Sequence, residues 1–281
     1  MIINKIEEAS RTKPLFEFDT LKDGKLCVTK GNVKLGNGIY TFSTLPGDMM
    51  HKLYIKGKSV LACNITGTCS GHCNACFDNG CYAVKSVQQY YKSVVPAWGG
   101  NTILLRSGKL FDELDKYIKS KNRWAARAPE MAEIKTFRIN VAGELRNSDD
   151  VEGWNELAKK HPDTVFSVYT KNYEAVEGFM ARHPKGTEPN FVINISQWHG
   201  CADKFLKRFP GKFNVFEYDD SNREDNRLSY DELVRLRGVT HCPAVDSNGK
   251  HAKTTSGEPI TCSSCMRCYR KGFTHTAVYS H

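Results

Sequence analysis

The chain has 281 residues, of which 40% are hydrophobic and 25% are charged, and its formal net charge at pH 7 is +9. These values are ordinary for a globular protein with a buried core, and no apolar run approaches the ~20 residues of a membrane-spanning helix, so we expect no membrane partner. The positive charge favours an anionic partner such as a nucleotide or a nucleic acid.

Residues 1–50 are interpreted as an N-terminal extension. The start of the chain, MIINKIEEASRTK, lacks the basic, apolar and small-residue order of a secretory signal, which predicts a cytoplasmic protein. Thiols are reduced in the cytoplasm, and disulfide-stapled scaffolds are usually much shorter chains. We therefore expect the cysteines to be metal ligands rather than disulfide partners.

The main domain, residues 51–241, is predicted to alternate strands with helices. Residues 52–62 are expected to form a strand that enters a cysteine-rich loop, and residues 83–95 a helix that leaves it. The other expected strands are at residues 136–143, 165–170, 191–196 and 213–218. Helices are expected at 110–118, 173–183, 202–209 and 229–237, and one more helix is expected to begin at a cap formed by Ser148. Strands that alternate with helices indicate a parallel sheet, so the predicted fold class is α/β, with a partial or full (β/α) barrel.

Residues 242–281 break this alternation, because they are polar, rich in glycine and short of periodic apolar positions. They contain four cysteines, Cys242, Cys262, Cys265 and Cys268. A segment of this kind needs a metal, or the main domain, to order it. We interpret it as a small metal-binding auxiliary segment.

Five more cysteines lie in and beside the loop of the main domain: Cys63, Cys69, Cys73, Cys76 and Cys81. Clustered thiolates bind iron–sulfur clusters and zinc far better than they bind magnesium or calcium. The spacing Cys69-x3-Cys73-x2-Cys76 places three thiolates on one short loop. A [4Fe–4S] cluster with only three protein ligands keeps one iron open for a small molecule. Which three of the five cysteines are ligands stays open.

A Cys-x3-Cys-x2-Cys loop after the first strand of a βα barrel resembles the cluster loop of the radical S-adenosylmethionine (SAM) superfamily, in which SAM chelates the open iron. The stretch Val141-Ala142-Gly143-Glu144 resembles the Gly-Gly-Glu element that receives the SAM amino group in that superfamily. A glutamate at a strand end offers carboxylate oxygens to an ammonium, and a glycine lets the backbone approach closely. The resemblance implies further SAM contacts at the strand ends, from Tyr169, Lys171, Asn194 and Ser196.

The second cysteine group resembles the auxiliary iron–sulfur domains that follow radical SAM barrels. There a cysteine, a spacer, a glycine and a second cysteine occur in that order, as Cys242, Gly257 and Cys262 do here. Cys265 and Cys268 would complete four ligands.

The chain also resembles the phage gene 88 protein family over most of its length. The similar segments are Cys81-Tyr82-Ala83-Val84-Lys85, FRINVAGE, VFSVYTK and CSSCMRC. This resemblance implies a phage origin and a location in the host cytoplasm.

The resemblance to the radical SAM superfamily implies reductive cleavage of SAM at a [4Fe–4S] cluster. The products would be methionine and a 5′-deoxyadenosyl radical that abstracts a hydrogen from the substrate, and the cofactor carries the difficult chemistry. The electron would come from a donor such as a flavodoxin or a ferredoxin, and the positive charge favours a nucleotide or nucleic-acid substrate. The C-terminal cysteines would hold a second cluster or zinc.

Three alternatives stay open. The protein could be a zinc-binding module for nucleic acid, since four-cysteine sites are common structural zinc sites. It could be a base-exchange barrel enzyme with structural zinc, in which Glu144 or Asp219 is the nucleophile. It could also be a structural protein whose barrel has no chemistry.

Overall fold

The structure is a computed structural model that describes residues 13–32, 34–47, 52–69, 81–128, 133–198, 200–219, 240–244, 253–272 and 275–279. The chain divides into two compact units. Unit 1 comprises Met1–Val28, Phe42–Tyr117 and Ala142–Arg146, and unit 2 comprises Thr29–Thr41, Ile118–Val141 and Asn147–His281. This division differs from the three consecutive segments 1–50, 51–241 and 242–281, because the chain passes back and forth between the units.

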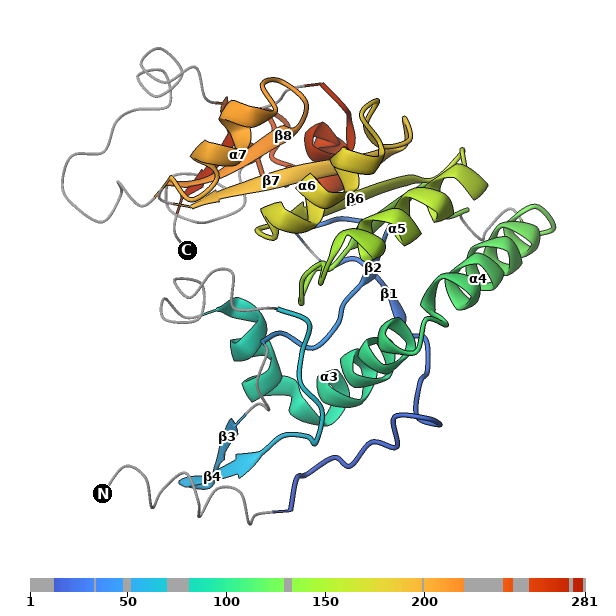
Figure 1. Ribbon diagram of the computed structural model, residues 1–281, viewed down its shortest axis with the longest axis vertical. Helices are drawn as coiled ribbons and strands as arrows, with labels where there is room; N and C mark the ends of the chain where they lie inside the picture. The colour runs from blue at the N-terminus through green and yellow to red at the C-terminus, as the bar shows by residue number, and fades with distance from the viewer. Residues whose placement is uncertain are drawn as a thin grey trace. The chain divides into compact units, whose positions relative to one another are not determined.

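The larger of the two sheets has eight strands, most of which are labelled in Figure 1. Its order is β1 (Val28–Lys30), β2 (Ile39–Phe42), β5 (Thr136–Ile139), β6 (Val165–Thr170), β7 (Phe191–Trp198), β8 (Asn214–Asp219), β10 (His275–Tyr279) and β9 (Thr240–His241). Every pairing from β2 to β9 is parallel. The expected α/β class with a mostly parallel sheet is therefore confirmed. Within the described residues, no helix is long and apolar enough to cross a membrane.

One face of this sheet is apolar and is covered by helices α5 (Ser148–Lys160), α6 (Tyr173–Arg182) and α7 (Asp203–Arg208), as Figure 1 shows. Phe137 of β5 and Phe166 of β6 are fully buried, and Trp154 of α5 packs on both rings with centroid separations of 6.1 and 6.4 Å. Burying side chains of this size supplies much of the free energy that holds a helix on a sheet.

The other face of the same strands carries polar side chains. Ser167, Asn194 and Asn214 occupy neighbouring strands on this face and are buried. Buried amides need hydrogen-bond partners. They find them in the C-terminal cysteine segment, which forms α9 (Cys262–Cys265) and the 3₁₀ helix η2 (Arg267–Tyr269).

Unit 1 is built around the kinked helix α3 (Tyr82–Arg106), which is longer than the expected 83–95 and contains Pro96. The helix packs on the hairpin of β3 (Lys52–Ile55) and β4 (Lys58–Leu61) around a core that includes Leu53, Val87 and Ile103. Helix α4 (Leu110–Ala125) follows where the sequence predicts a helix at 110–118.

The structure corrects the expected single strand at residues 52–62. These residues form the antiparallel hairpin of β3 and β4, outside the main sheet. Lys56 (φ 49°) and Gly57 (φ 75°) are both left-handed, as a two-residue type I′ turn requires. In chain order this hairpin comes after β2, and the cysteine-rich stretch comes after the hairpin and before α3.

Two smaller corrections concern β5 and α5. The strand ends at Ile139 instead of residue 143, because Asn140 is left-handed (φ 48°) and cannot continue a strand. The cap of α5 is Asn147 rather than Ser148, since the Asn147 side chain accepts hydrogen bonds from the Asp149 and Asp150 backbone.

The C-terminal segment also contributes a strand that the sequence analysis did not predict. Strand β10 lies inside the sheet, between β8 and β9. The expected helix at 229–237 lies outside the described residues.

Candidate functional site

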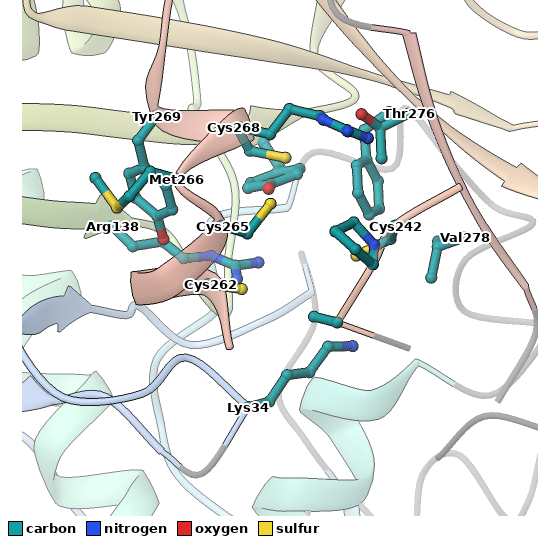
Figure 2. A pocket seen from close by; sticks show the side chains of 15 residues that line it. Lys34, Arg138, Cys242, Cys262, Cys265, Met266, Cys268, Tyr269, Thr276 and Val278 are labelled. Atoms are coloured by element: carbon teal, nitrogen blue, oxygen red, sulfur yellow. The ribbon is translucent and has the colours of Figure 1, made fainter. Parts of the chain in front are cut away.

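Four cysteines line one cavity of about 130 Å³ in unit 2: Cys242, Cys262, Cys265 and Cys268. Cys242 directly follows β9, whereas the other three lie on α9 and η2. Figure 2 shows the three side chains of the α9–η2 segment on one side of the cavity and Cys242 on the other. The structure therefore brings together the four thiols that the sequence grouped as one site.

Local structure holds these cysteines in place. Thr261 caps α9 through a capping box with Ser264, and Met266 is left-handed (φ 55°), so that the chain turns between Cys265 and Cys268. The turn lets three cysteines at a spacing of three residues reach the same cavity.

The α9 segment is docked on the loop before β2. The backbone N–H groups of Cys262 and Ser263 donate to the carbonyls of Lys34 and Leu35, at 3.1 and 2.9 Å. Gly36 makes this approach possible, because a Cβ at that position would lie 2.2 Å from the Ser263 Oγ and 2.6 Å from the Thr261 Oγ1.

Two cations share the cavity with the thiols. Lys34 and Arg138 both line it (Figure 2). The Arg138 guanidinium lies 4.5 Å from the centre of the Tyr169 ring. Burial lowers the pKa of Lys34, while the neighbouring thiols Cys242 and Cys262 act in the opposite direction. At Cys262, burial raises the pKa of the thiol, and the charges of Arg138 and Lys34 act in the opposite direction.

Burial has the largest effect on the pKa of two of the four thiols, Cys262 and Cys268. Burial raises the pKa of Cys268 to about 11 and also raises the pKa of Cys262. Metal binding has to displace the protons of these two thiols.

The four thiols line a common cavity. In the part of the chain that the structure describes, no group of three or more His, Cys, Asp or Glu residues has an arrangement that could hold a metal ion. A single zinc ion needs four sulfurs within about 2.3 Å of one position. A cavity of about 130 Å³ has room for a larger group than one ion.

The Gly143–Glu144 turn of unit 1 lies against the residue that precedes the cysteine loop. The Glu144 backbone N–H donates to the Thr68 Oγ1 at 2.9 Å, and Thr68 immediately precedes Cys69. The Thr68 hydroxyl also lies 2.8 Å from the Thr44 hydroxyl. The turn expected to receive SAM is therefore attached to the start of the loop expected to hold the cluster.

Gly143 fits this place because it has no side chain. Its φ is +84°, and a Cβ would lie 1.9 Å from the Thr44 Oγ1 and 2.6 Å from the Thr68 Oγ1. The Glu144 carboxylate accepts a hydrogen bond from the Leu145 backbone at 2.8 Å, which orients it.

The cysteines of the first group differ in their surroundings. Cys63 is fully buried, and its thiol donates to the Ile65 carbonyl at 3.3 Å. Cys69 and Cys81 are half-buried, at the two sides of the stretch that carries Cys73 and Cys76. Cys73 and Cys76 lie outside the described residues. The surroundings of Cys63 are those of a core cysteine rather than a ligand.

Two arginines near this turn were not singled out in the sequence. Arg106 donates to the Thr66 hydroxyl at 2.6 Å and to the Gly67 carbonyl at 2.9 Å, and Arg146 donates to the Leu105 carbonyl at 3.3 Å. Burial and the charge of Arg146 lower the pKa of Arg106. Their positions, at a helix end and after a loop glutamate, gave no motif by which to find them.

The strand-end residues expected to contact SAM lie in unit 2. Asn194 donates to the carbonyls of Cys268 and Val168, at 3.0 and 3.1 Å, so its amide binds the cysteine segment. Tyr169 lines the four-cysteine cavity, where burial raises the pKa of its hydroxyl. The Ser196 carbonyl accepts from the Tyr173 hydroxyl at 2.6 Å, and Lys171 is half-buried directly after β6.

No match was found among curated proteins or among solved structures. A family model described as Gene product 88 matches residues 21–271, which confirms the resemblance seen in the sequence. The chain therefore belongs to the gene product 88 family.

Proposed function

We propose that this protein is an iron–sulfur enzyme of the radical SAM type. Cysteines of the 69–81 loop would hold a [4Fe–4S] cluster, and the Gly143–Glu144 turn would bind SAM. The observation that carries the proposal is the 2.9 Å hydrogen bond from the Glu144 backbone to Thr68, next to Cys69. This hydrogen bond joins Glu144, which is expected to accept the SAM amino group, to the residue before Cys69, which is expected to ligate the cluster. Glu144 and Thr68 are 76 residues apart in sequence.

In this proposal the residues of the turn bind and orient SAM. The Glu144 carboxylate accepts hydrogen bonds from the SAM ammonium, and the absence of a side chain at Gly143 allows the backbone to lie close to Thr44 and Thr68. With the cluster bound, the available chemistry is one-electron reduction of the sulfonium, which releases methionine and a 5′-deoxyadenosyl radical. Cys63 is not part of the proposed ligand set, because its thiol is buried and donates to a carbonyl.

We propose that the four C-terminal cysteines hold a second iron–sulfur cluster. Sulfur ligands suit both iron–sulfur clusters and zinc. The thiols line one cavity of about 130 Å³, a volume that suits a polynuclear group better than a single zinc ion. Lys34 and Arg138 would offset the negative charge that four thiolates add.

We also propose that the sheet is curved into a partial (β/α) barrel. From β2 to β8, the order of the strands in this sheet follows their order in the chain, and every pairing is parallel, as in such barrels. The net charge of +9 supports a nucleotide or nucleic-acid substrate. A small redox protein such as a flavodoxin or ferredoxin would supply the electron.

The first test is the metal content of the protein purified without oxygen. About eight irons per chain with equal sulfide would match two clusters, and about four would match one cluster. Zinc without iron would contradict the proposal and favour a zinc-binding module.

The second test is turnover of SAM by the reduced protein. We expect 5′-deoxyadenosine to be released, and Cys73→Ala to abolish its release. Glu144→Gln should keep the iron but raise the KM for SAM by about tenfold, because it removes one charge-assisted contact. No 5′-deoxyadenosine from fully loaded protein would refute the radical chemistry.

A matched pair of glycine variants tests the turn itself. Gly143→Ala should abolish turnover, since its Cβ would collide with Thr44 and Thr68. Gly108→Ala is the control, because Gly108 has a similar φ of +73° but no atom within 4 Å of a Cβ. Equal turnover in the two variants would show that the turn does not bind SAM.

A further inference from the structure

A second cavity, of about 490 Å³, lies at the amino ends of β7 and β8 in unit 2. Its walls come from the chain segments at residues 185–187, 210–213 and 271–272. The strand ends expected to face SAM are at the opposite, carboxyl edge of the same sheet. The cavity thus belongs to neither of the sites described above.

Three lysines from three separate loops line this cavity: Lys185, Lys212 and Lys271. All three are exposed, and the described residues that line the cavity include no aspartate or glutamate. Glu188 is an acidic neighbour of Lys271 but does not line the cavity. The charged side chains that line the cavity are therefore all positive, and they attract anions.

Backbone carbonyls hold two of these ammonium groups at the rim. The Lys271 Nζ donates to the Thr187 carbonyl at 2.6 Å, and the Lys212 Nζ donates to the Pro184 carbonyl at 3.1 Å. An ammonium has three donors, so each group can still donate to a ligand. Both side chains are thus partly ordered before any ligand arrives, which lowers the entropy cost of binding.

The loops leave room for a ligand at the backbone. Gly186, Gly211 and Gly272 all have positive φ, at 94°, 65° and 144°. A Cβ at Gly186 or Gly272 would have no protein atom within 4 Å, so these turns border open space. Glycine turns of this kind let phosphate oxygens approach backbone N–H groups.

Part of the cavity lining is apolar. Met180, Val192, Ile193 and Phe213 all line it, and Phe213 is the least buried of the four. A volume of 490 Å³ lies within the range of roughly 300–1,000 Å³ that is typical of sites for small ligands. Apolar and cationic lining residues together suit a ligand with an apolar or aromatic body and an anionic end.

We propose that this cavity binds a phosphate-bearing ligand of nucleotide size. The three lysines contact the phosphate groups, and the half-buried Phe213 contacts the body of the ligand. The phosphates could belong to a free nucleotide or to the end of a nucleic-acid strand, and the test separates these two sources.

The test is fluorescence anisotropy of the full-length protein with two probes: a fluorescently labelled adenosine diphosphate, and a labelled short DNA strand with a 5′-phosphate. Unlabelled adenosine and inorganic pyrophosphate serve as competitors. We expect pyrophosphate, but not adenosine, to displace the bound probe. A free nucleotide is the source if adenosine diphosphate binds, and a strand end is the source if only the 5′-phosphorylated strand binds.

Variants locate the binding. Lys271→Gln and Lys212→Gln should each weaken binding by about tenfold, because each removes a charge-assisted contact to phosphate. Lys185→Gln removes a third lysine but leaves both hydrogen bonds to the Thr187 and Pro184 carbonyls in place. Lys204→Gln is the matched control, since Lys204 is an exposed lysine on α7 that does not line the cavity.

The proposal is overturned if neither probe binds, or if Lys271→Gln, Lys212→Gln and Lys185→Gln bind the probe as tightly as Lys204→Gln. Displacement by adenosine as effective as by pyrophosphate would also overturn it. The measurement needs neither SAM nor a reductant. Its outcome is therefore independent of the proposed radical chemistry.

Discussion

Asn194 illustrates how one buried side chain attaches the cysteine segment to the sheet. Its amide donates to the carbonyls of Cys268 and Val168 and to the Ser167 hydroxyl, and its oxygen accepts from Asn214. Buried carbonyls that lose a partner bear the full cost of desolvation. The position of Cys268 in the cavity therefore depends on a residue of β7.

We predict that Asn194→Ala lowers the free energy of unfolding by roughly 1–3 kcal/mol and also speeds release of metal from the C-terminal cysteines. Urea denaturation measures the first effect, and transfer of metal to a coloured chelator measures the second.

Asn190→Ala is the matched control for this prediction. The Asn190 amide likewise donates to three acceptors, the carbonyls of Ala158, His161 and Thr164, but none belongs to the cysteine segment. It should lose similar stability and release metal at the wild-type rate. Equal release rates in the two variants would show that Asn194 does not hold the site.

Cys63 makes stability depend on pH in the alkaline range. Burial raises the pKa of its thiol above the ordinary value of 9.0, so the folded protein keeps the thiol neutral where the unfolded chain ionises it. The neutral thiol contributes fully to the free energy of unfolding below about pH 9, and this contribution is lost as the pH rises through the folded pKa.

We predict that the difference in unfolding free energy between wild type and Cys63→Ala shrinks as the pH rises above about 9, as measured by urea denaturation of the metal-free protein. Cys201→Ala is the control, because Cys201 is exposed. A difference that stays constant with pH would contradict the buried neutral thiol. The variant should also keep its iron after anaerobic purification, since Cys63 is not a proposed ligand.

At the scale of elements, helix α9 depends on a glycine in another loop. We predict that Gly36→Ala destabilises unit 2 and displaces α9, because a Cβ there would lie 2.2 Å from the Ser263 Oγ. Overpacking of this kind costs roughly 1–3 kcal/mol beyond the strain of the left-handed backbone.

Gly38→Ala isolates that backbone strain. Its φ is +89°, close to the +77° of Gly36, but nothing lies within 4 Å of its Cβ. Thermal unfolding and metal content of the two variants should differ, with the larger loss in Gly36→Ala. Matching values would mean that α9 does not rest on Gly36.

The elements that the sequence predicted well are those whose pattern is local. Strands β6, β7 and β8 and helices α5 and α6 follow directly from hydrophobic alternation and periodicity. The β3–β4 hairpin was missed because its turn is Lys56–Gly57, without the Asn-Gly or Asp-Gly signal. Strand β10 was missed because it is a short run directly after the cysteine segment, and its neighbours in the sheet are set by long-range pairing.

At the scale of the whole molecule, the sequence predicted which C-terminal cysteines lie together better than it predicted their surroundings. Cysteine spacing was enough to group Cys242 with Cys262, Cys265 and Cys268, and all four line one cavity. The neighbours Lys34 and Arg138 could not be predicted, because they reach the cavity from distant parts of the chain. The contact between Glu144 and Thr68 could not be predicted either, because the two residues are 76 apart in sequence and no local pattern indicates their contact.

The docked cysteine segment continues directly into a lysine of the second cavity. Cys268 and Lys271 lie on one short stretch of chain, and the Arg270 carbonyl between them accepts a hydrogen bond from Asn214 at 3.0 Å. We predict that the two proposed ligands bind with coupled affinities: a phosphate ligand that orders this stretch would raise the affinity of the cysteines for metal, and the metal would raise the affinity for phosphate by the same factor. Such reciprocity would let the protein sense its own metal loading through a ligand that never touches the thiols.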